Sequence, residues 1–315
     1  MRLACPGSLA EGDGRLKVLA CIVTYNRIDL LERCVDGVRA QSRPVDALLV
    51  INNGSTDDTV ARLAARNVDV LTQDNVGSAG GWSRAIAHAL ENGFDAVWLM
   101  DDDGCPDPGA LAILADNLTP DRACISSVVL QEDRPTHFVF PFPRLDRDGQ
   151  PAIFAWPRKT PTLAGLQAQA KDGIYPFAHL FNGALVSCVA ARAVGNVETR
   201  YFFFGDEVDY FMRLSAWGPV VSHLDAKHYH PDVTRRPINE FRLYYYVKNT
   251  LILNRLYFNK PLLRSILTVG VGLARLRARS GWKSLFSMTV GAQRRVLWKA
   301  IARGFRGQVG DDLHV

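Results

Sequence analysis

The sequence predicts an α/β protein with a mainly parallel, Rossmann-like nucleotide-binding sheet, followed by a helical and basic C-terminal region. Two observations carry this prediction. Apolar strand-like segments alternate with helical segments over the first third of the chain. From Arg255 onward 12 Lys and Arg stand against 2 Asp and Glu, whereas the whole chain of 315 residues carries only +5. We therefore expect a loose tail over residues 1–15, a sheet domain over 16–238 and a basic helical region over 239–315.

The alternating segments have the spacing of βαβ units, which form parallel sheets with right-handed crossovers. Continuous apolar runs predict strands at 17–23, 46–51, 68–71 and 95–100. Helices are predicted over 28–40, from a capping-box pattern at 55–58 to about 65, and over 82–92 after a glycine turn at 77–81. Further along we expect a helix over 109–117, a strand over 125–130, looped hairpins over 131–175, a strand over 181–189, an aromatic strand over 201–204 and a helix ending near 217.

Polar clusters follow the predicted strands at their carboxyl ends, where parallel sheets bind ligands. These clusters are Thr24-Tyr25-Asn26, Asn52-Asn53-Gly54, Asp74-Asn75 and Asp101-Asp102-Asp103. In the last of them, three adjacent carboxylates repel one another unless a cation lies between them. Carboxylate oxygens suit Mg²⁺ and Mn²⁺, so the triplet predicts a metal site. The alternative is a helix cap or a solvated turn.

A second acidic group, Asp206 and Glu207, opens a predicted helix. The helix dipole stabilises carboxylates there as anions, so a base at this position is expected to be ionised at neutral pH. Asp206 fits the N-cap, which leaves Glu207 to point into a cleft; capping alone is the alternative. Downstream, His228 and His230 share one face of an extended segment. Each is a candidate metal ligand, although a lone histidine is more often structural.

The glycine turn at 77–81 has two interpretations. Its backbone N–H groups can approach a phosphate, or its small residues can permit close packing. The turn matches neither the dinucleotide fingerprint nor the P-loop, which disfavours a hydride-transferring dehydrogenase.

Seven strings stand in one order between residues 17 and 231: CIVTYNR (21–27), INNGSTDDT (51–59), DNVGSAGGW (74–82), WLMDDDG (98–104), FNGALVS (181–187), GDEVDYFMRL (205–214) and LDAKHYHP (224–231). Together they resemble the family 2 inverting glycosyltransferases, which have a GT-A fold. WLMDDDG, FNGAL, GDEVD and HP are most similar to the motifs of bacterial galactofuranosyltransferases and the neighbouring rhamnosyltransferases.

The resemblance implies a nucleotide-sugar site at the carboxyl ends of the strands. Thr24, Tyr25 and Arg27 are expected to line the nucleotide pocket. Asn52 stands where many relatives have an aspartate that faces the base or ribose, so the base stays open. Trp82 is expected either to stack on the sugar or nucleotide or to pack in the protein. The other implied nucleotide-sugar positions are Asn75, Gly80, Gly81, Asp101 and Asp102.

The resemblance also implies a metal and a base. Asp101 and Asp103 form the D-x-D pair, and His230 is the additional ligand of Mn²⁺ or Mg²⁺, with His228 as second choice. Glu207 falls where the family usually has its catalytic aspartate. We expect it to remove the proton of the acceptor hydroxyl, and Asp206 is the alternative base. The positions expected near the acceptor are Asn182, Gly183 and His228.

The implied function is transfer of a sugar, first of all galactofuranose from UDP-galactofuranose, to a lipid-linked or polysaccharide acceptor in cell-surface glycan synthesis. The alternatives are a dTDP-rhamnose-dependent rhamnosyltransferase and a non-catalytic, membrane-associated scaffold with a nucleotide fold. A nucleotidyltransferase is disfavoured, because Thr-Tyr-Asn-Arg follows the first strand instead of a glycine-rich loop with a basic residue.

Composition predicts the setting in which the protein acts. Six cysteines without a CxxC pair predict a reduced, cytoplasmic environment. The basic C-terminal region predicts either peripheral association with the anionic inner face of the cell membrane or packing on the catalytic domain. No nucleic-acid partner is expected, because the body is acidic and no recognition motif occurs.

Overall fold

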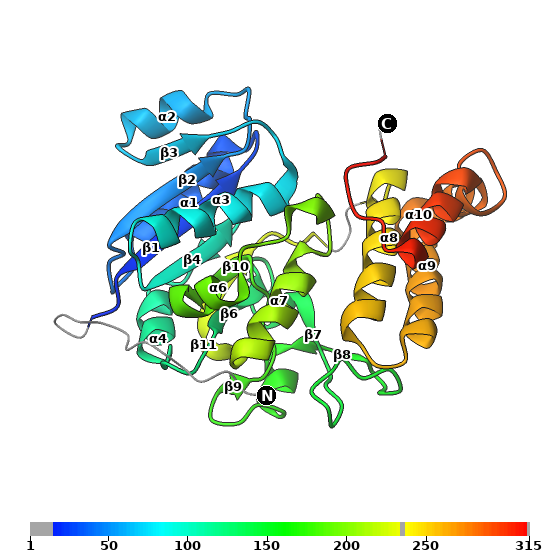
Figure 1. Cartoon of the computed structure of the whole chain (residues 1–315). Coiled ribbons are helices and arrows are strands. Elements are labelled where there is room, and N and C mark those ends of the chain that lie inside the picture. Colours follow the sequence, from blue (N-terminus) through cyan, green and yellow to red (C-terminus); the bar gives the residue numbers. More distant parts are fainter. Residues whose placement is uncertain (1–14, 234–236, 314–315) are drawn as a thin grey trace. The chain divides into compact units, whose positions relative to one another are not determined.

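The structure is a computed structural model that describes residues 15–233 and 237–313. The tail expected over 1–15 lies, except for Arg15, outside the described residues. The chain divides into two compact units (Figure 1). The first unit contains the residues up to Val197 together with Tyr210–Asp232, and the second contains Glu198–Asp209 together with the residues from Val233 onward. The segment with Asp206 and Glu207 therefore clusters with the C-terminal helices, although the sequence placed it in the sheet domain.

The first unit, which we call the sheet unit, is built on a largely parallel sheet. Its strands are β1 (Val18–Thr24), β2 (Ala47–Asn52), β3 (Asp69–Thr72), β4 (Ala96–Asp101), β5 (Cys105–Pro106), β6 (Cys124–Gln131), β7 (His137–Pro143), β8 (Lys159–Thr162), β9 (Ile174–Tyr175), β10 (Asn182–Ser187) and β11 (Val220–His230). The main spatial order is β3-β2-β1-β4-β10-β6-β11-β5. β1 pairs in parallel with β2 and β4, and β6 with β11, whereas β10 is antiparallel to β4 and β6. The carboxyl ends of β1, β2 and β4 consequently share one edge of the sheet.

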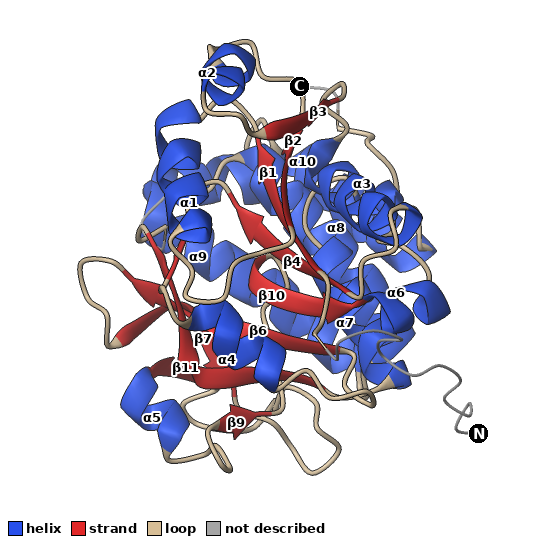
Figure 2. Cartoon of the chain, turned by 90° about the vertical axis from the view of Figure 1, so that its left-hand side faces the viewer, coloured by secondary structure: helices blue, strands red, loops and turns tan. Residues whose placement is uncertain are grey.

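Helices cover both faces of this sheet (Figure 2). They are α1 (Ile28–Arg39), α2 (Thr59–Ala65), α3 (Gly77–Glu91), α4 (Ala110–Asp116), α5 (Leu163–Gln167), α6 (Cys188–Val194) and α7 (Asp206–Trp217), whose first turn belongs to the second unit. Side chains of β1 alternate between two cores, one with α1 and α4 and the other with α3 and α6. Every residue of β1 is buried, as expected for a parallel strand covered on both faces. The predicted α/β architecture is confirmed.

Three predictions of local structure are wrong, and the first two concern the capping box and the aromatic strand. The capping box at 55–58 does not form, because α2 begins only at Thr59 and no side chain caps it. The hydroxyl of Ser55 instead accepts a hydrogen bond from the backbone N–H of Asn26. The aromatic strand expected at 201–204 is a short 3-10 helix (Thr199–Tyr201) and a turn, in which Phe202 and Phe204 have positive φ.

The glycines that were expected to form a turn lie inside α3, which begins at Gly77. A Cβ on Gly81 would lie 2.5 Å from Cγ1 of Val23, and one on Gly80 would lie 2.3 Å from Cγ2 of Val76. Gly81 therefore lets α3 pack closely on β1, and Gly80 leaves room for Val76 just before the helix, which agrees with the packing alternative. Trp82 packs as well: it is buried and stacks on Phe181, with ring centroids 4.5 Å apart. These contacts favour the packing alternative, and the predicted contacts of Gly80, Gly81 and Trp82 with the nucleotide-sugar stay predictions.

The second unit, which we call the helical unit, consists mainly of α8 (Glu240–Tyr257), α9 (Pro261–Thr289) and α10 (Arg294–Arg306). Leu243, Tyr244, Tyr245 and Leu251 of α8 form a core with Leu276 and Met288 of α9 and with Leu297 and Ala300 of α10. The buried ammonium group of Lys248 donates to Asp312 Oδ1 over 2.9 Å and to the Gly310 carbonyl over 2.7 Å. The C-terminal segment is thereby fastened to α8. Within the described residues, no helix has the length and apolar character needed to span a bilayer.

Candidate active site

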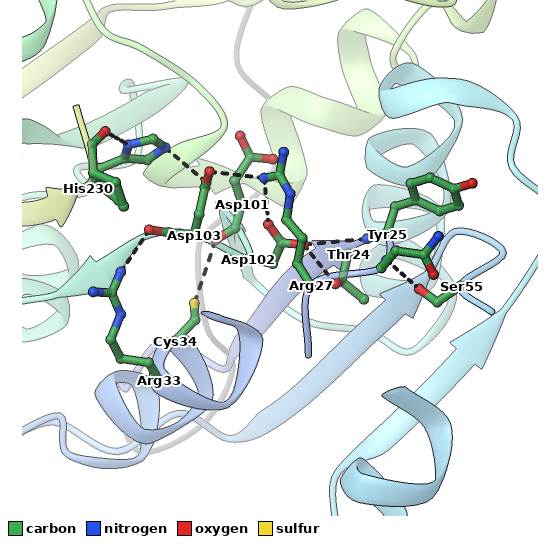
Figure 3. Close-up of polar contacts among 12 residues, drawn as sticks. Thr24, Tyr25, Arg27, Arg33, Cys34, Ser55, Asp101, Asp102, Asp103 and His230 are labelled. Carbon is green, nitrogen blue, oxygen red and sulfur yellow. Dashed lines mark hydrogen bonds and ion pairs between the residues drawn. The ribbon is translucent and has the colours of Figure 1, made fainter. Parts of the chain in front are cut away.

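The carboxylates of Asp102 and Asp103 are buried directly beyond the end of β4 (Figure 3). Two adjacent buried charges are costly unless other groups compensate them. The hydroxyl of Thr24 donates to Asp102 over 2.7 Å. The Arg27 guanidinium donates to Asp102 over 3.2 Å and to Asp103 over 2.9 Å. Burial raises the pKa of Asp102, against the opposing effects of Thr24 and Arg27. The end of β1 and the turn after it therefore contact the end of β4, and Arg27 partly compensates the negative charge of the two aspartates.

β11 brings a histidine to the same carboxylates. His230 Nε2 lies 2.9 Å from Oδ1 of Asp103, and His230 Nδ1 lies 2.7 Å from the Pro231 carbonyl oxygen. Since a carbonyl only accepts, we assign the ring proton to Nδ1. In a neutral ring, the lone pair of Nε2 then faces a carboxylate oxygen, a contact that needs a proton or a cation between the two atoms. Metal-ligating histidines have this arrangement, with the other ring nitrogen bonded to a carbonyl.

Arg33 of α1 belongs to the candidate site, although the sequence did not reveal it. Its guanidinium donates to the backbone carbonyl of Asp103 over 3.0 Å and pairs with Glu132 over 2.7 Å. Figure 3 shows Asp103 between Arg27, Arg33 and His230. Asp103 is thus fixed through both its side chain and its backbone. No sequence pattern marks Arg33, because its partners are distant in the chain.

The predicted metal ligands are only partly brought together. Asp103 and His230 are in contact, but in the described part of the chain no three or more His, Cys, Asp and Glu side chains form a group that could hold a metal ion. The full set of Asp101, Asp103 and His230 is therefore not assembled. Sites for Mg²⁺ often use only one or two protein carboxylates and complete their shell with substrate phosphates and water, so the Asp103–His230 pair still fits such an ion.

At the end of β2, the side chain of Asn52 forms hydrogen bonds within the protein. It is fully buried, its Oδ1 accepts from the Ser55 N–H over 2.9 Å, and its Nδ2 donates to the Thr72 hydroxyl over 3.3 Å. Asn52 thus holds the turn after β2, and its predicted contact with the base or ribose stays a prediction. Tyr25, by contrast, is 47% exposed beside the aspartates, so its ring is accessible to a ligand.

Asn53, which the sequence did not single out, ties two loops of this edge together. Its Nδ2 donates to Oδ1 of Asn75 over 3.2 Å and to the Gly77 carbonyl over 3.1 Å. The Asn75 oxygen also accepts from the Gly77 N–H over 3.1 Å. Asn75 therefore shapes the start of α3, and its predicted contact with the nucleotide-sugar stays a prediction.

The three positions expected near the acceptor are buried in the sheet unit. Burial lowers the pKa of His228 to about 3, so its ring is neutral. A Cβ on Gly104 would lie 1.9 Å from His228 Nε2, and one on Gly183 would lie 3.1 Å from Nδ1. His228 thus fills the space between two glycines and supports the turn that follows the aspartates. Asn182 is also buried, and its Oδ1 has no hydrogen-bond partner among the described residues.

The acidic pair lies at the start of α7. Asp206 is the first residue of the helix and is buried, so it does not stand before the helix as a cap. Burial, and secondarily the charge of Glu207, raises the pKa of Asp206 to about 7. The expectation of a fully ionised carboxylate is therefore wrong for Asp206, because desolvation outweighs the helix dipole. Glu207 is half-buried, and its role as base stays a prediction.

A side chain of α8 fixes the conformation of the backbone just before this acidic pair. The buried side-chain amide of Asn249 donates to the carbonyls of Tyr201 (3.0 Å), Phe203 (3.0 Å) and Phe204 (2.6 Å). Gly205 follows with φ of 103°, and a Cβ there would lie 3.0 Å from Cβ of Asn249. Only a glycine fits such a conformation and approach without strain. A polar Lys-Asn pair inside an otherwise apolar helical run was the available sequence signal for Asn249.

Known proteins resemble the chain in sequence. The model of the family described as Glycosyl transferase family 2 matches residues 20–169. Galactofuranosyltransferase GlfT1 of Mycobacterium tuberculosis is 35% identical over 223 residues, which are 68% of this chain and 70% of that protein. GlfT1 of Mycolicibacterium smegmatis is 34% identical over 221 residues, with the same shares. The chain belongs to glycosyltransferase family 2. It is therefore a glycosyltransferase enzyme, as the order of its motifs predicted.

Solved glycosyltransferase structures share the GT-A fold with this family member. GalNAc-T7 with UDP, GalNAc and Mn²⁺ has a TM-score of 0.59 and 13% identity, covering 91% of this chain and 58% of that chain. The mannosyltransferase PcManGT of Pyrobaculum calidifontis with GDP-Man and Mn²⁺ has a TM-score of 0.54 and 16% identity, covering 93% and 86%. TarS of S. aureus has a TM-score of 0.56 and 13% identity, covering 93% and 81%. The predicted fold is confirmed.

Substituting Asp206 should change how the stability of this glycosyltransferase depends on pH. The folded-state pKa of about 7 exceeds the ordinary 3.8, so the stability that the protonated group contributes is present below pH 4 and is lost as the pH rises through 7. Between these limits the free energy of unfolding of the wild type should fall by at most about 4 kcal/mol relative to that of Asp206→Asn. Urea unfolding of both proteins across this range measures the difference, and parallel curves would contradict a raised pKa.

Asn249→Ala should loosen the segment before the acidic pair. Three carbonyls lose their donor, and the bond to the carbonyl of Tyr201 is buried, where an unsatisfied group costs about 1–3 kcal/mol. We expect faster amide hydrogen exchange over residues 201–207 and a fall in kcat of about tenfold. The matched control is Asn254→Ala on the same helix, whose amide bonds Ser265 and Thr268 of α9 instead. Equal exchange over 201–207 in the two variants would show that Asn249 does not hold this segment.

Proposed function

We propose that this glycosyltransferase transfers galactofuranose from UDP-galactofuranose, with inversion, to a lipid-linked or polysaccharide acceptor in cell-surface glycan synthesis. The observation that carries the proposal is the 35% identity to a mycobacterial galactofuranosyltransferase, which extends over 70% of that protein. The motifs WLMDDDG, FNGAL and GDEVD, which resemble the galactofuranosyl group, agree with it. Rhamnosyl transfer from dTDP-rhamnose is the alternative that the experiments below distinguish.

The exposed groups at the sheet edge support a site for the nucleoside diphosphate. The Arg27 side chain is 41% exposed while it bonds Asp102 and Asp103, so its guanidinium can meet a phosphate from the solvent side. The exposed ring of Tyr25 stands beside it and can stack on the base or ribose. Both residues follow β1, where a parallel sheet binds its ligands.

Asp103 and His230 would hold the divalent cation, Mn²⁺ or Mg²⁺, with Asp101 as the third candidate ligand. When bound, the cation supplies positive charge that stabilises the departing nucleoside diphosphate. The hydrogen bond from His230 Nδ1 to the Pro231 carbonyl keeps the Nε2 lone pair directed at Asp103. Arg33 holds the backbone of Asp103 in place for the same purpose. Two neighbours of known structure, GalNAc-T7 and PcManGT, contain Mn²⁺.

Glu207 would act as the base. It takes the proton of the acceptor hydroxyl, whose oxygen attacks the anomeric carbon opposite the diphosphate and so inverts the configuration. No covalent enzyme intermediate is required. Glu207 is favoured because it is half-buried, whereas Asp206 is almost fully enclosed. The raised pKa of Asp206, about 7, is suited to proton transfer at neutral pH and keeps Asp206 as the alternative.

Calorimetric titration with UDP and with dTDP, each with and without Mn²⁺, tests the donor site. We expect Mn²⁺-dependent binding with a preference for UDP, and about tenfold weaker metal-dependent binding in His230→Gln. His223→Gln on the same strand is the matched control and should bind as the wild type does. A preference for dTDP would favour rhamnosyl transfer. If no nucleotide binds with or without metal, the proposed donor site is wrong.

Glu207→Gln tests the base in a transfer assay with UDP-galactofuranose. Loss of the general base should lower kcat by about 10²–10⁴-fold while UDP binding stays unchanged. Asp206→Asn is compared in the same assay. Should Glu207→Gln keep its activity and Asp206→Asn lose it, Asp206 is the base.

A further inference from the structure

The helical unit combines a one-sided charge with exposed apolar side chains. From Pro261 to Gly310 the chain has 10 Lys and Arg and no Asp or Glu. Many of the large exposed hydrophobic residues of the described chain lie here as well. They are Leu262, Ile266, Trp282, Phe286, Val290, Trp298 and Phe305. Exposed hydrophobic residues that cluster on a protein surface usually mark a site of interaction.

A break at Gly281 separates the last part of α9, which contains the exposed aromatic residues Trp282 and Phe286, from the long part before it. Gly281 has φ 82° and ψ 177°, which are not helical. Just before it, the Ser280 hydroxyl accepts from the Ile238 N–H over 3.1 Å and donates to the Ile238 carbonyl over 2.8 Å. The long part of α9 is therefore fixed up to the break, and a new helical segment starts at Trp282 (Figure 1, orange).

Beyond the break, the exposed residues form one line. Trp282 and Phe286 lie one turn apart on one side of the helix, and Val290 follows four residues later as the C-cap of α9. The three are 66%, 67% and 58% exposed. We call these three residues the aromatic stripe. Met288, on the opposite side of the same segment, is buried in the core of the helical unit. The core thus orients the segment so that the stripe faces solvent.

Cations lie close to the stripe in the sequence, and one of them contacts it. Arg279 and Lys283 are exposed next to it, and the Arg277 guanidinium lies 4.2 Å from the centroid of the Trp282 ring. On α10, Trp298 and Phe305 lie two turns apart and are exposed, together with Arg294 and Arg295. Exposed tryptophan rings together with basic side chains are typical of segments that lie in the headgroup region of an anionic bilayer.

We propose that the aromatic stripe and the basic residues around it form a docking surface for an anionic phospholipid bilayer, with the stripe inserted at headgroup level. Electrostatic attraction to anionic lipids and burial of the apolar side chains then add. A second copy of the chain is a poor occupant, because it brings the same positive charge. A nucleic acid would use the cations and leave Phe286 and Val290 without an apolar partner.

This surface deepens the proposed function, since it would bring the enzyme to a lipid-linked acceptor, but it is tested without any sugar. The full chain is sedimented with vesicles of phosphatidylcholine alone or with about 30% phosphatidylglycerol. We expect at least about tenfold stronger partition onto the anionic vesicles, reduced by about 0.5 M NaCl. The double variant Trp282→Ser/Phe286→Ser should lose about tenfold of that partition.

The matched control is Phe154→Ser/Trp156→Ser, which removes two aromatic residues of the sheet unit that are 77% and 91% exposed. It should partition as the wild type does. Equal partition onto neutral and anionic vesicles, or an unchanged stripe variant, would overturn the proposal. So would a stripe variant whose only change is the loss of a dimer in analytical ultracentrifugation, or one that loses binding to a single-stranded oligonucleotide and not to vesicles. Donor titration of the same variant should be unchanged, so failure of the donor site is recognised separately.

Discussion

The side-by-side burial of Asp102 and Asp103 is the constraint on which the sheet edge depends. Two desolvated carboxylates are tolerated only if fixed donors surround them. Thr24 and Arg27, which donate to these carboxylates, come from the end of β1 and the turn after it, and His230, which contacts Asp103, comes from the end of β11. Each of these contacts also ties its segment to the end of β4. Removing one partner would leave a buried charge uncompensated, so the same contacts that stabilise this edge hold the groups that are proposed to act on the donor.

In the helical unit a neutral side chain, that of Asn249, stabilises an unfavourable local conformation. Phe202 and Phe204 have positive φ, a conformation that costs about 1 kcal/mol or more for such residues and persists only where the surroundings enforce it. Asn249 enforces it by bonding three carbonyls of this turn. The Tyr257 hydroxyl adds a 2.6 Å bond to Asp209, one turn further along. α8 therefore holds the backbone that precedes the acidic pair, which contains the proposed base.

The sequence predicted those features that depend on local pattern. The apolar run at 17–23 became β1 (Val18–Thr24), and the polar clusters at strand ends did meet at one edge. Features set by distant contacts were not predictable. The sequence around Gly81 does not distinguish a glycine that faces a phosphate from one that faces Val23. The 2.5 Å between a Cβ at Gly81 and Cγ1 of Val23 is known only from the fold. Asn52 and Arg33 likewise take their roles from partners brought near by folding, and the raised pKa of Asp206 comes from burial, which no local pattern specifies.

The small net charge of the chain conceals an uneven distribution of charge along the sequence. The part before Arg255 is acidic as a whole, while the segment from Pro261 to Gly310 has only cations. An anionic surface attracts the second and repels the first, so charge alone favours docking through the helices and keeps the acidic sheet unit off the lipid. The break at Gly281 adds the apolar component, because it lets Trp282 and Phe286 face outward while Met288 remains in the core. In the proposed docking, electrostatics would thus select the unit that approaches the membrane, and the aromatic stripe would determine the side of that unit that enters it.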